Sequence, residues 1–299
     1  QSEMTGTWSD SWILGAGGLY TCSYGCAWEP RGGDGYPIHD LVRLPGRLLC
    51  AAHWGLWEVT EDGSGEAIWT QLHDETLTEC LSIAPSDGAP VDTGPGVVAG
   101  SAYGLAFGKR IQLGACRWRS RDHGLSLNER FTNTVICHPD RPQTWLTGTE
   151  SGVLIYSAID DAWLRSDLTG RPCRALLHAL GRFWAGTDEG GIWSSADGLA
   201  WQRAGSGLDD GTIFSLAATT DRILAGTLQG ICVGDAEASW HRCGPRLLVS
   251  AIAADPDRQG PWLAGATPGG LRRSDDDGSP WCQVGNFDTV QSILPPEAA

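Results

Sequence analysis

The chain has 299 residues and a formal net charge of -15, with 41% hydrophobic and 19% charged residues. These proportions are typical of a globular protein with an apolar core and exclude a disordered chain. The negative charge disfavours nucleic acid as a partner, because phosphate contacts depend on positive charge. No apolar stretch approaches the roughly 18–20 residues of a spanning helix, so we predict no membrane span.

The N-terminal residues predict the cellular setting. Met4 is the only methionine, so we interpret residues 1–3 as a tag remnant, Met4 as the initiator, and residues 4–299 as one domain. With no secretory leader before Met4, the expected location is the cytoplasm, where the 10 cysteines would be mostly reduced. Cys22 and Cys26 flank a turn, where a disulfide is the alternative to two thiols.

A repeated segment runs along the whole chain. One copy, FWAGTDEGGIWSSADGLAW at residues 183–201, shows the pattern of two apolar stretches, a glycine turn and a final aromatic residue. In chain order the copies end at Trp28, Trp69, Leu127, Trp163, Trp201, Trp240 and Trp281. The spacing is about 36–41 residues except around one longer copy, and this period with short strands predicts an all-β, seven-bladed β-propeller.

Each copy is expected to form four strands. In the sixth copy, residues 212–220 would form the inner strand and residues 222–227 the second strand. The first copy lacks an inner strand, whereas residues 289–296 follow the seventh copy without a partner. We therefore expect the C-terminal strand to complete the first blade and close the ring.

Acidic turns recur between the third and fourth expected strands. The pattern Ser-x-Asp-x-Gly-x-x-Trp occupies residues 274–281, and related copies lie at 21–28, 120–127 and 195–201. Aspartate can accept backbone N–H bonds within its own turn, glycine supplies a positive φ, and tryptophan fills the space between sheets. A feature used once per blade is architectural, so Asp276 and its counterparts are expected on the face away from any site.

These turns and their LAGT context resemble the Asp-box, or BNR, repeats of the sialidase-like propeller superfamily over nearly the whole chain. The resemblance implies the propeller fold and is compatible with both enzymes and binding scaffolds. The Phe/Tyr-Arg-Ile-Pro stretch of sialidases has its nearest counterpart in Tyr-Pro-Ile-His at residues 36–39, which lacks the arginine. Sialidase activity is therefore disfavoured.

Ligands of propellers usually meet the face that carries the links between blades and the turns between second and third strands. We call this the top face. Residues expected there vary in charge and size between copies, as in a site built on a scaffold. The candidate binding residues are His39, His53, Trp54, Glu79, Tyr103, Asn133, Glu150, Arg174, Asp188, Glu189 and Gln291.

The third copy carries an insertion at residues 102–115, interpreted as a long loop in place of the second-to-third-strand turn. It contains Lys109, the only lysine, beside Arg110, and we add both to the candidates. A long loop in a compact ring is usually functional, and an aromatic and basic loop could grip a partner's carboxylate, phosphate or acidic peptide. The alternative is a loop that packs over its neighbour.

The first interpretation of function is a non-catalytic binding or assembly propeller that holds a protein or small-molecule partner on its top face. The alternative is an enzyme at the top of the central channel. Glu79 with Asp188 or Glu189 could form a carboxylate pair for glycoside hydrolysis. His39 and His53 could hold a metal for a lyase-like reaction, but no spacing matches a known ligand pattern, so no metal site is predicted. The sequence assigns no cofactor and no catalytic residue.

Overall fold

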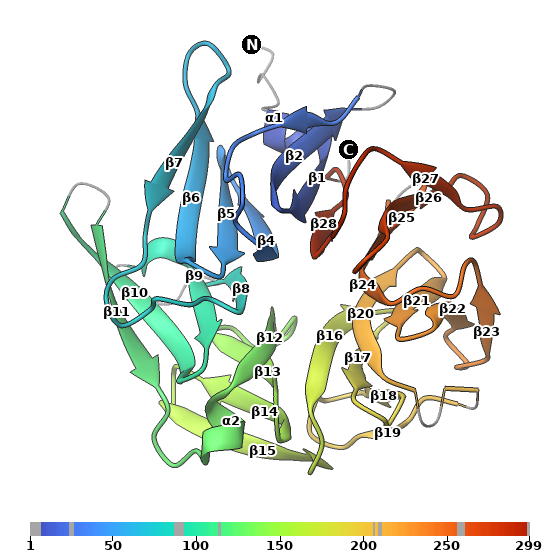
Figure 1. Ribbon diagram of the computed structural model, residues 1–299. Helices are drawn as coiled ribbons and strands as arrows, with labels where there is room; N and C mark the ends of the chain where they lie inside the picture. The colour runs from blue at the N-terminus through green and yellow to red at the C-terminus, as the bar shows by residue number, and fades with distance from the viewer. Residues whose placement is uncertain are drawn as a thin grey trace.

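The computed structural model describes residues 7–23, 27–86, 93–112, 115–205, 207–208, 211–255 and 261–297. These residues form seven four-stranded sheets arranged around one axis (Figure 1). The predicted seven-bladed β-propeller is confirmed. The proposed tag remnant, Met4 and Cys26 lie outside the described residues, and so does the Cys22–Cys26 pair.

The blades follow one another along the chain, and their strands are named from the innermost to the outermost. Blade 1 contains β28 (Ser292–Leu294), β1 (Ser11–Ala16), β2 (Gly18–Ser23) and β3 (Glu29–Pro30). Blade 2 contains β4 (Ile38–Leu44), β5 (Arg47–Ala52), β6 (Gly55–Glu61) and β7 (Ala67–Gln71). Blade 3 contains β8 (Ser82–Pro85), β9 (Thr93–Ser101), β10 (Gly104–Gln112) and β11 (Ala115–Arg121). Blade 4 contains β12 (Thr132–Cys137), β13 (Thr144–Thr149), β14 (Gly152–Ser157) and β15 (Ala162–Thr169).

The remaining three blades have the same order. Blade 5 contains β16 (Cys173–Ala179), β17 (Arg182–Thr187), β18 (Ile192–Ser195) and β19 (Gln202–Arg203). Blade 6 contains β20 (Ile213–Ala218), β21 (Arg222–Thr227), β22 (Gly230–Asp235) and β23 (Trp240–Cys243). Blade 7 contains β24 (Val249–Ala254), β25 (Trp262–Ala266), β26 (Gly270–Ser274) and β27 (Cys282–Val284). Two one-turn helices, α1 (Thr7–Asp10) and α2 (Leu127–Arg130), precede β1 and β12.

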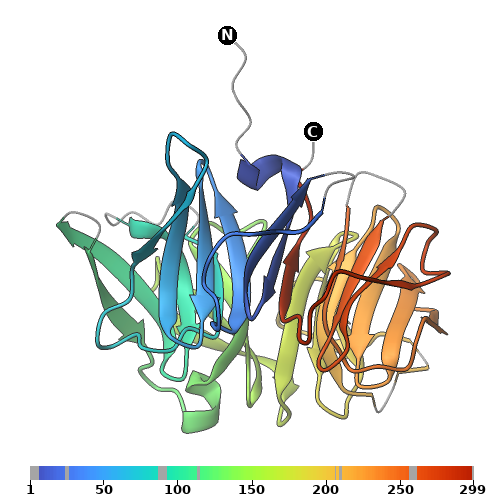
Figure 2. The ribbon, with the colours of Figure 1, turned by 45° about the horizontal axis from the view of Figure 1, so that its top comes forward.

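The two ends of the chain close the ring, as the sequence predicted. β28 pairs antiparallel with β1, with Ser292 opposite Gly15. The Gln291 N–H donates to the carbonyl of Gly15 at 2.9 Å and extends this pairing by one bond. Figure 2 shows β28, in red, beside β1, in blue.

Close approach between blades depends on the glycine of the second strand. A Cβ at Gly186 would lie 2.6 Å from the Cγ2 of Ile213 in the next blade, and one at Gly265 would lie 2.5 Å from the Cγ1 of Val290. Real Cβ atoms do not approach so closely, so at these two positions the segment of the following blade can pack only against glycine. This requirement explains why the sequence repeats Ala-Gly in its second strands.

Tryptophans of the outer strands join consecutive blades. The indole N–H of Trp69 donates to the carbonyl of Arg31 at 2.7 Å, and that of Trp240 donates to the carbonyl of Ala204 at 2.7 Å. In blade 3 this role belongs to Trp118, which is buried and donates to the carbonyl of Leu72 at 2.8 Å. The sequence interpretation, which aligned Leu127 with the other aromatic ends, is wrong, since Leu127 is 80% exposed in α2.

The insertion of blade 3 also differs from its prediction. The turn between β9 and β10 consists of residues 102–103, and the extra length lies in the β10–β11 hairpin. Lys109 lies opposite Arg117 in this hairpin, and Arg110 lies opposite Cys116. Lys109 and Arg110 therefore belong to strand β10 rather than to a loop of the top face.

The turn chemistry expected of the acidic segments is seen at residues 195–201, between β18 and β19. The carboxylate of Asp197 accepts the N–H groups of Leu199 and Ala200 at 2.8 and 3.0 Å. At residues 274–281 the Ser274 hydroxyl accepts the N–H of Gly278, whose φ is 93°. The segment 120–127 instead contains the last two residues of the outer strand β11 and the start of the link to blade 4, so its interpretation as a turn of this kind is wrong.

No helix in the described ranges is both long and apolar enough to cross a membrane.

Candidate functional site

The inner strands begin at the top face with a shared irregularity. In five blades the second residue of the inner strand is an extra residue in the ladder, which is a β-bulge. These residues are His39, Asn133, Arg174, Phe214 and Ser250. A bulge re-aims a side chain without disturbing the rest of the strand, and bulges are frequent beside functional sites.

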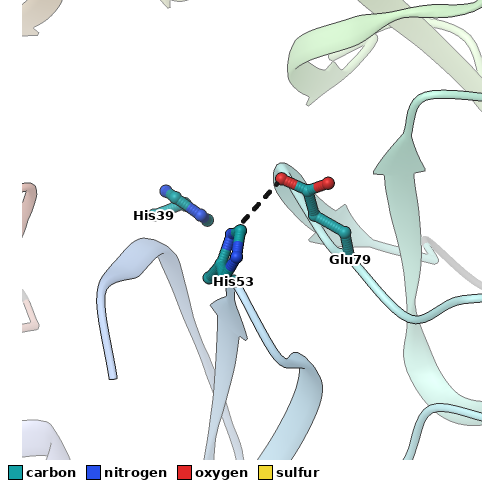
Figure 3. Close-up of side chains that lie close together, drawn as sticks. All are labelled: His39, His53 and Glu79. Carbon is teal, nitrogen blue, oxygen red and sulfur yellow. Dashed lines mark ion pairs between the residues drawn. The ribbon is translucent and has the colours of Figure 1, made fainter. Parts of the chain in front are cut away.

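Three candidate residues converge where blades 2 and 3 meet. His39 comes from the bulge of β4, His53 from the turn between β5 and β6, and Glu79 from the link between β7 and β8. One ligand atom of each residue lies within 4.8 Å of the others, and the Nδ1 of His53 is 3.6 Å from the Oε1 of Glu79 (Figure 3). The sequence proposed each residue separately but gave no sign that they meet.

The environment of His39 favours a neutral imidazole. Burial lowers the pKa of His39, the nearby Glu79 opposes this effect, and His53 adds to it. Its Nε2 is buried and has no hydrogen-bond partner within the described part of the chain. A buried imidazole nitrogen that lacks a partner carries a desolvation cost, and a metal ion or a ligand N–H would offset it.

The donor set fits a divalent transition metal. Two imidazoles and one carboxylate are a known ligand set for zinc, with one position left open for water or a ligand. Ligand atoms about 2.1 Å from a tetrahedral zinc lie about 3.4 Å apart. The distance from His53 to Glu79, 3.6 Å, already approaches this value, and the ligand atom of His39 lies within 4.8 Å of both.

An exposed aromatic ring lies beside this cluster. Trp54 is 57% exposed and its ring centroid is 5.1 Å from that of His53. Tyr103, in the turn between β9 and β10 of the neighbouring blade, is 59% exposed. Exposed aromatic side chains at a polar site are typical of surfaces that bind a partner.

The corresponding positions of blades 4 and 5 are occupied by internal pairs. Arg174 donates two hydrogen bonds to the carboxylate of Asp188, at 2.6 and 2.7 Å, and its Nη1 lies 3.7 Å from Glu150. The Asn133 amide donates to Glu150 at 2.9 Å and to the carbonyl of Cys173 at 3.2 Å. These four candidates therefore satisfy one another.

The carboxylates considered for glycoside hydrolysis have separate partners. Glu79 faces His53, whereas Asp188 is held by the bidentate pair with Arg174. Glu189 has a positive φ of 50°, and its N–H donates to the hydroxyl of Thr212. Nothing in this arrangement joins Glu79 to either residue as an acid and base pair.

Two further residues complete the top face. The side-chain oxygen of Gln291 is buried and has no partner among the described residues. Ser250, which the sequence analysis did not select, donates to the carbonyl of Val290 at 2.6 Å and lies 2.8 Å from the hydroxyl of Thr267. Its place at the top face depends on the bulge of β24, which is visible only in the pairing of β24 with β25.

Comparisons with known proteins show the fold. No protein-family model and no curated protein sequence matches the chain. The extracellular domain of the putative one component system BT4673 from B. thetaiotaomicron has a TM-score of 0.63 at 17% identity, over 88% of this chain and 36% of that chain. This chain thus spans just over a third of that protein's length.

Two WD40 domains are similar over most of both chains. The WD40 β-propeller domain of Doa1 has a TM-score of 0.61 at 10% identity, with 85% of each chain covered. The Neurospora crassa Pan2 WD40 domain has a TM-score of 0.62 at 14% identity, over 95% of this chain and 89% of that chain. At such low identity the likeness establishes a β-propeller fold alone.

Proposed function

We propose that the protein is a non-catalytic binding propeller whose top face captures a partner through a divalent transition metal held by His39, His53 and Glu79. The observation that carries this proposal is the convergence of these three ligand atoms within 4.8 Å. The open coordination position would accept a donor group of a protein or small-molecule partner, and Trp54 and Tyr103 would supply apolar contact area.

The experiment is a calorimetric titration of metal-free protein with zinc. We expect one site, and we expect His53→Ala and Glu79→Gln each to weaken zinc binding at least tenfold, because each removes a direct ligand. His241→Ala is the matched control, because His241 is an exposed histidine in the outer strand β23. Equal zinc affinity of His53→Ala and the unaltered protein would contradict the proposal.

The open position can be tested with cobalt as a spectroscopic substitute for zinc. We expect added imidazole or acetate, which mimic histidine and carboxylate side chains, to change the visible spectrum of the cobalt-loaded protein. A metal with all positions filled by protein would leave the spectrum unchanged, and the capture role would then be wrong even though a metal binds.

The same donor set favours one second candidate, metal-dependent catalysis. Zinc held by two histidines and a glutamate activates its bound water in hydrolytic enzymes. Zinc-dependent hydrolysis of p-nitrophenyl acetate that disappears in Glu79→Gln would favour this candidate. Stoichiometric zinc binding without zinc-dependent hydrolysis favours the binding role.

A further inference from the structure

A cationic hairpin stands out in this acidic protein. Residues 109–121 contain five of the 21 lysine and arginine residues and no aspartate or glutamate, although the whole chain carries a net charge of -15. The five residues are Lys109, Arg110, Arg117, Arg119 and Arg121. The hairpin consists of β10 and β11, at the outer edge of blade 3 (Figure 1).

Strand alternation separates this hairpin into a core face and a cationic face. Cys116 and Trp118 are buried, and they pack with apolar residues of blade 2. Arg117 and Arg119 alternate with them and are exposed. Arg110, which lies opposite Cys116, is 3.4 Å from Glu58 of blade 2.

The cationic face covers a pocket between blades 3 and 4. The pocket has a volume of about 670 Å³, within the range of small-molecule sites. Its residues from blade 3 include Phe107, Lys109, Arg117, Arg119 and Arg121, and those from blade 4 include Tyr156 and Asp161. Tyr156 lies near the end of β14 and Asp161 in the turn between β14 and β15, so the pocket opens at the end of the ring opposite the top face.

Most of the positive charge in this pocket is uncompensated. Arg121 lies 3.5 Å from Asp161, whose carboxylate also accepts the hydroxyl of Tyr156. Throughout the described segments, Lys109, Arg117 and Arg119 form no ion pair and no side-chain hydrogen bond. Lys109 lies directly opposite Arg117 across the ladder, an arrangement of like charges that destabilises a sheet.

We infer that this pocket binds a small polyanion with at least two phosphate or carboxylate groups. Side chains on alternate residues of one strand are about 6.7 Å apart, so Arg117 and Arg119 can each contact a different acidic group of one ligand. Phe107, on the strand opposite Arg119, provides an apolar wall for the rest of the molecule. A small ligand is favoured over a long acidic polymer, because the net charge of -15 repels an extended polyanion beyond the pocket.

The test is calorimetry with two probes, pyrophosphate and citrate. The protein is metal-free, because both probes chelate metals and would otherwise also bind a metal held at the top face. We expect at least one probe to bind at a single site. Binding of pyrophosphate alone identifies a phosphate ligand, and binding of citrate alone identifies a carboxylate ligand. Absence of binding by both probes at millimolar concentration overturns the inference.

Variants locate the site. We expect Arg119→Gln and Lys109→Gln each to weaken the affinity for the probe at least fivefold. Arg246→Gln should leave this affinity unchanged, because Arg246 is exposed and follows the outer strand of blade 6. Lys109→Gln should keep or slightly raise the melting temperature, since it removes the repulsion from Arg117. Equal weakening by Arg246→Gln, or undiminished binding in both pocket variants, overturns the inference.

Discussion

Blades 4 and 5 and blade 2 form two sectors of the top face that share the inner-strand bulge but differ in what the bulged side chain contacts. Asn133 and Arg174 lie at bulges of blades 4 and 5, and their side chains end in a closed set of hydrogen bonds with Glu150 and Asp188. His39 lies at the same bulge in blade 2, yet its Nε2 has no partner within the described ranges. A satisfied sector stabilises the ring, whereas an unsatisfied one is available to a ligand.

Zinc should give the largest contrast between the sectors. At a free zinc concentration 100 times the dissociation constant, linkage adds about 2.7 kcal/mol to the free energy of unfolding. We expect this gain in the unaltered protein and in Asn133→Ala, but not in His53→Ala, as measured by chemical denaturation with and without zinc. A similar gain in His53→Ala would place the metal elsewhere.

Arg174→Ala should damage the satisfied sector and leave zinc binding intact. The substitution leaves the carboxylates of Asp188 and Glu150 without their cation. Because all three side chains are partly exposed to solvent, the expected loss in unfolding free energy is limited to about 2 kcal/mol. Denaturation curves of Arg174→Ala, Asp188→Ala and the double variant measure the coupling. Additive losses would show that this pair does not stabilise the ring.

Asp40, next to His39, should make the open sector sensitive to pH. Burial raises the pKa of Asp40 to about 6, although Ile83 and Leu41 donate N–H bonds to its carboxylate. The Asp40 carboxyl group stays protonated to a higher pH in the folded state than in the unfolded chain. Its contribution to the free energy of unfolding is therefore fully present below about pH 4 and is lost as the pH rises through about 6. We expect unfolding free energies of the unaltered protein, relative to Asp40→Asn, to fall by about 1–2 kcal/mol between pH 4 and 6.5. A rise over this range would contradict the assignment.

Glu129 should show a smaller effect of opposite sign beside blade 4. The hydrogen bonds from Arg165 hold the pKa of Glu129 down at about 2, and the Ser126 N–H adds to this effect. Stability from this pair is therefore present above about pH 4.5 and is lost as pH falls toward 2. Because Arg165 is half exposed, the expected difference from Glu129→Gln is below about 1 kcal/mol. Thermal melts of both proteins between pH 2.5 and 5 would measure it, and a constant difference would argue against the pair.

The ring could be predicted because its signals are local and repeated. The tryptophan ends and the Ala-Gly of the second strands follow from packing that recurs from blade to blade, and the unpaired C-terminal segment follows from the closure of the ring. The prediction failed in blade 3, where extra residues could be assigned either to a turn or to longer strands. The alternation of Arg117, Trp118 and Arg119 indicates a strand, and it would have supported the hairpin over the loop.

The candidate site was only partly predictable. The sequence placed His39, His53 and Glu79 among the variable residues of the top face, but their convergence depends on a bulge and on the approach of two blades. Similarly, Arg174 and Asp188 have the same kind of sequence context as His39 and His53. Only three-dimensional contacts distinguish side chains that satisfy one another from side chains that remain open.

Anomalous diffraction at the zinc edge, from crystals of the zinc-loaded full chain, tests the central claim most directly. We predict a single strong peak about 2.0–2.2 Å from one nitrogen of His39, one nitrogen of His53 and one oxygen of Glu79. A zinc peak bound by other residues, with these three side chains unchanged and unliganded, would contradict the account.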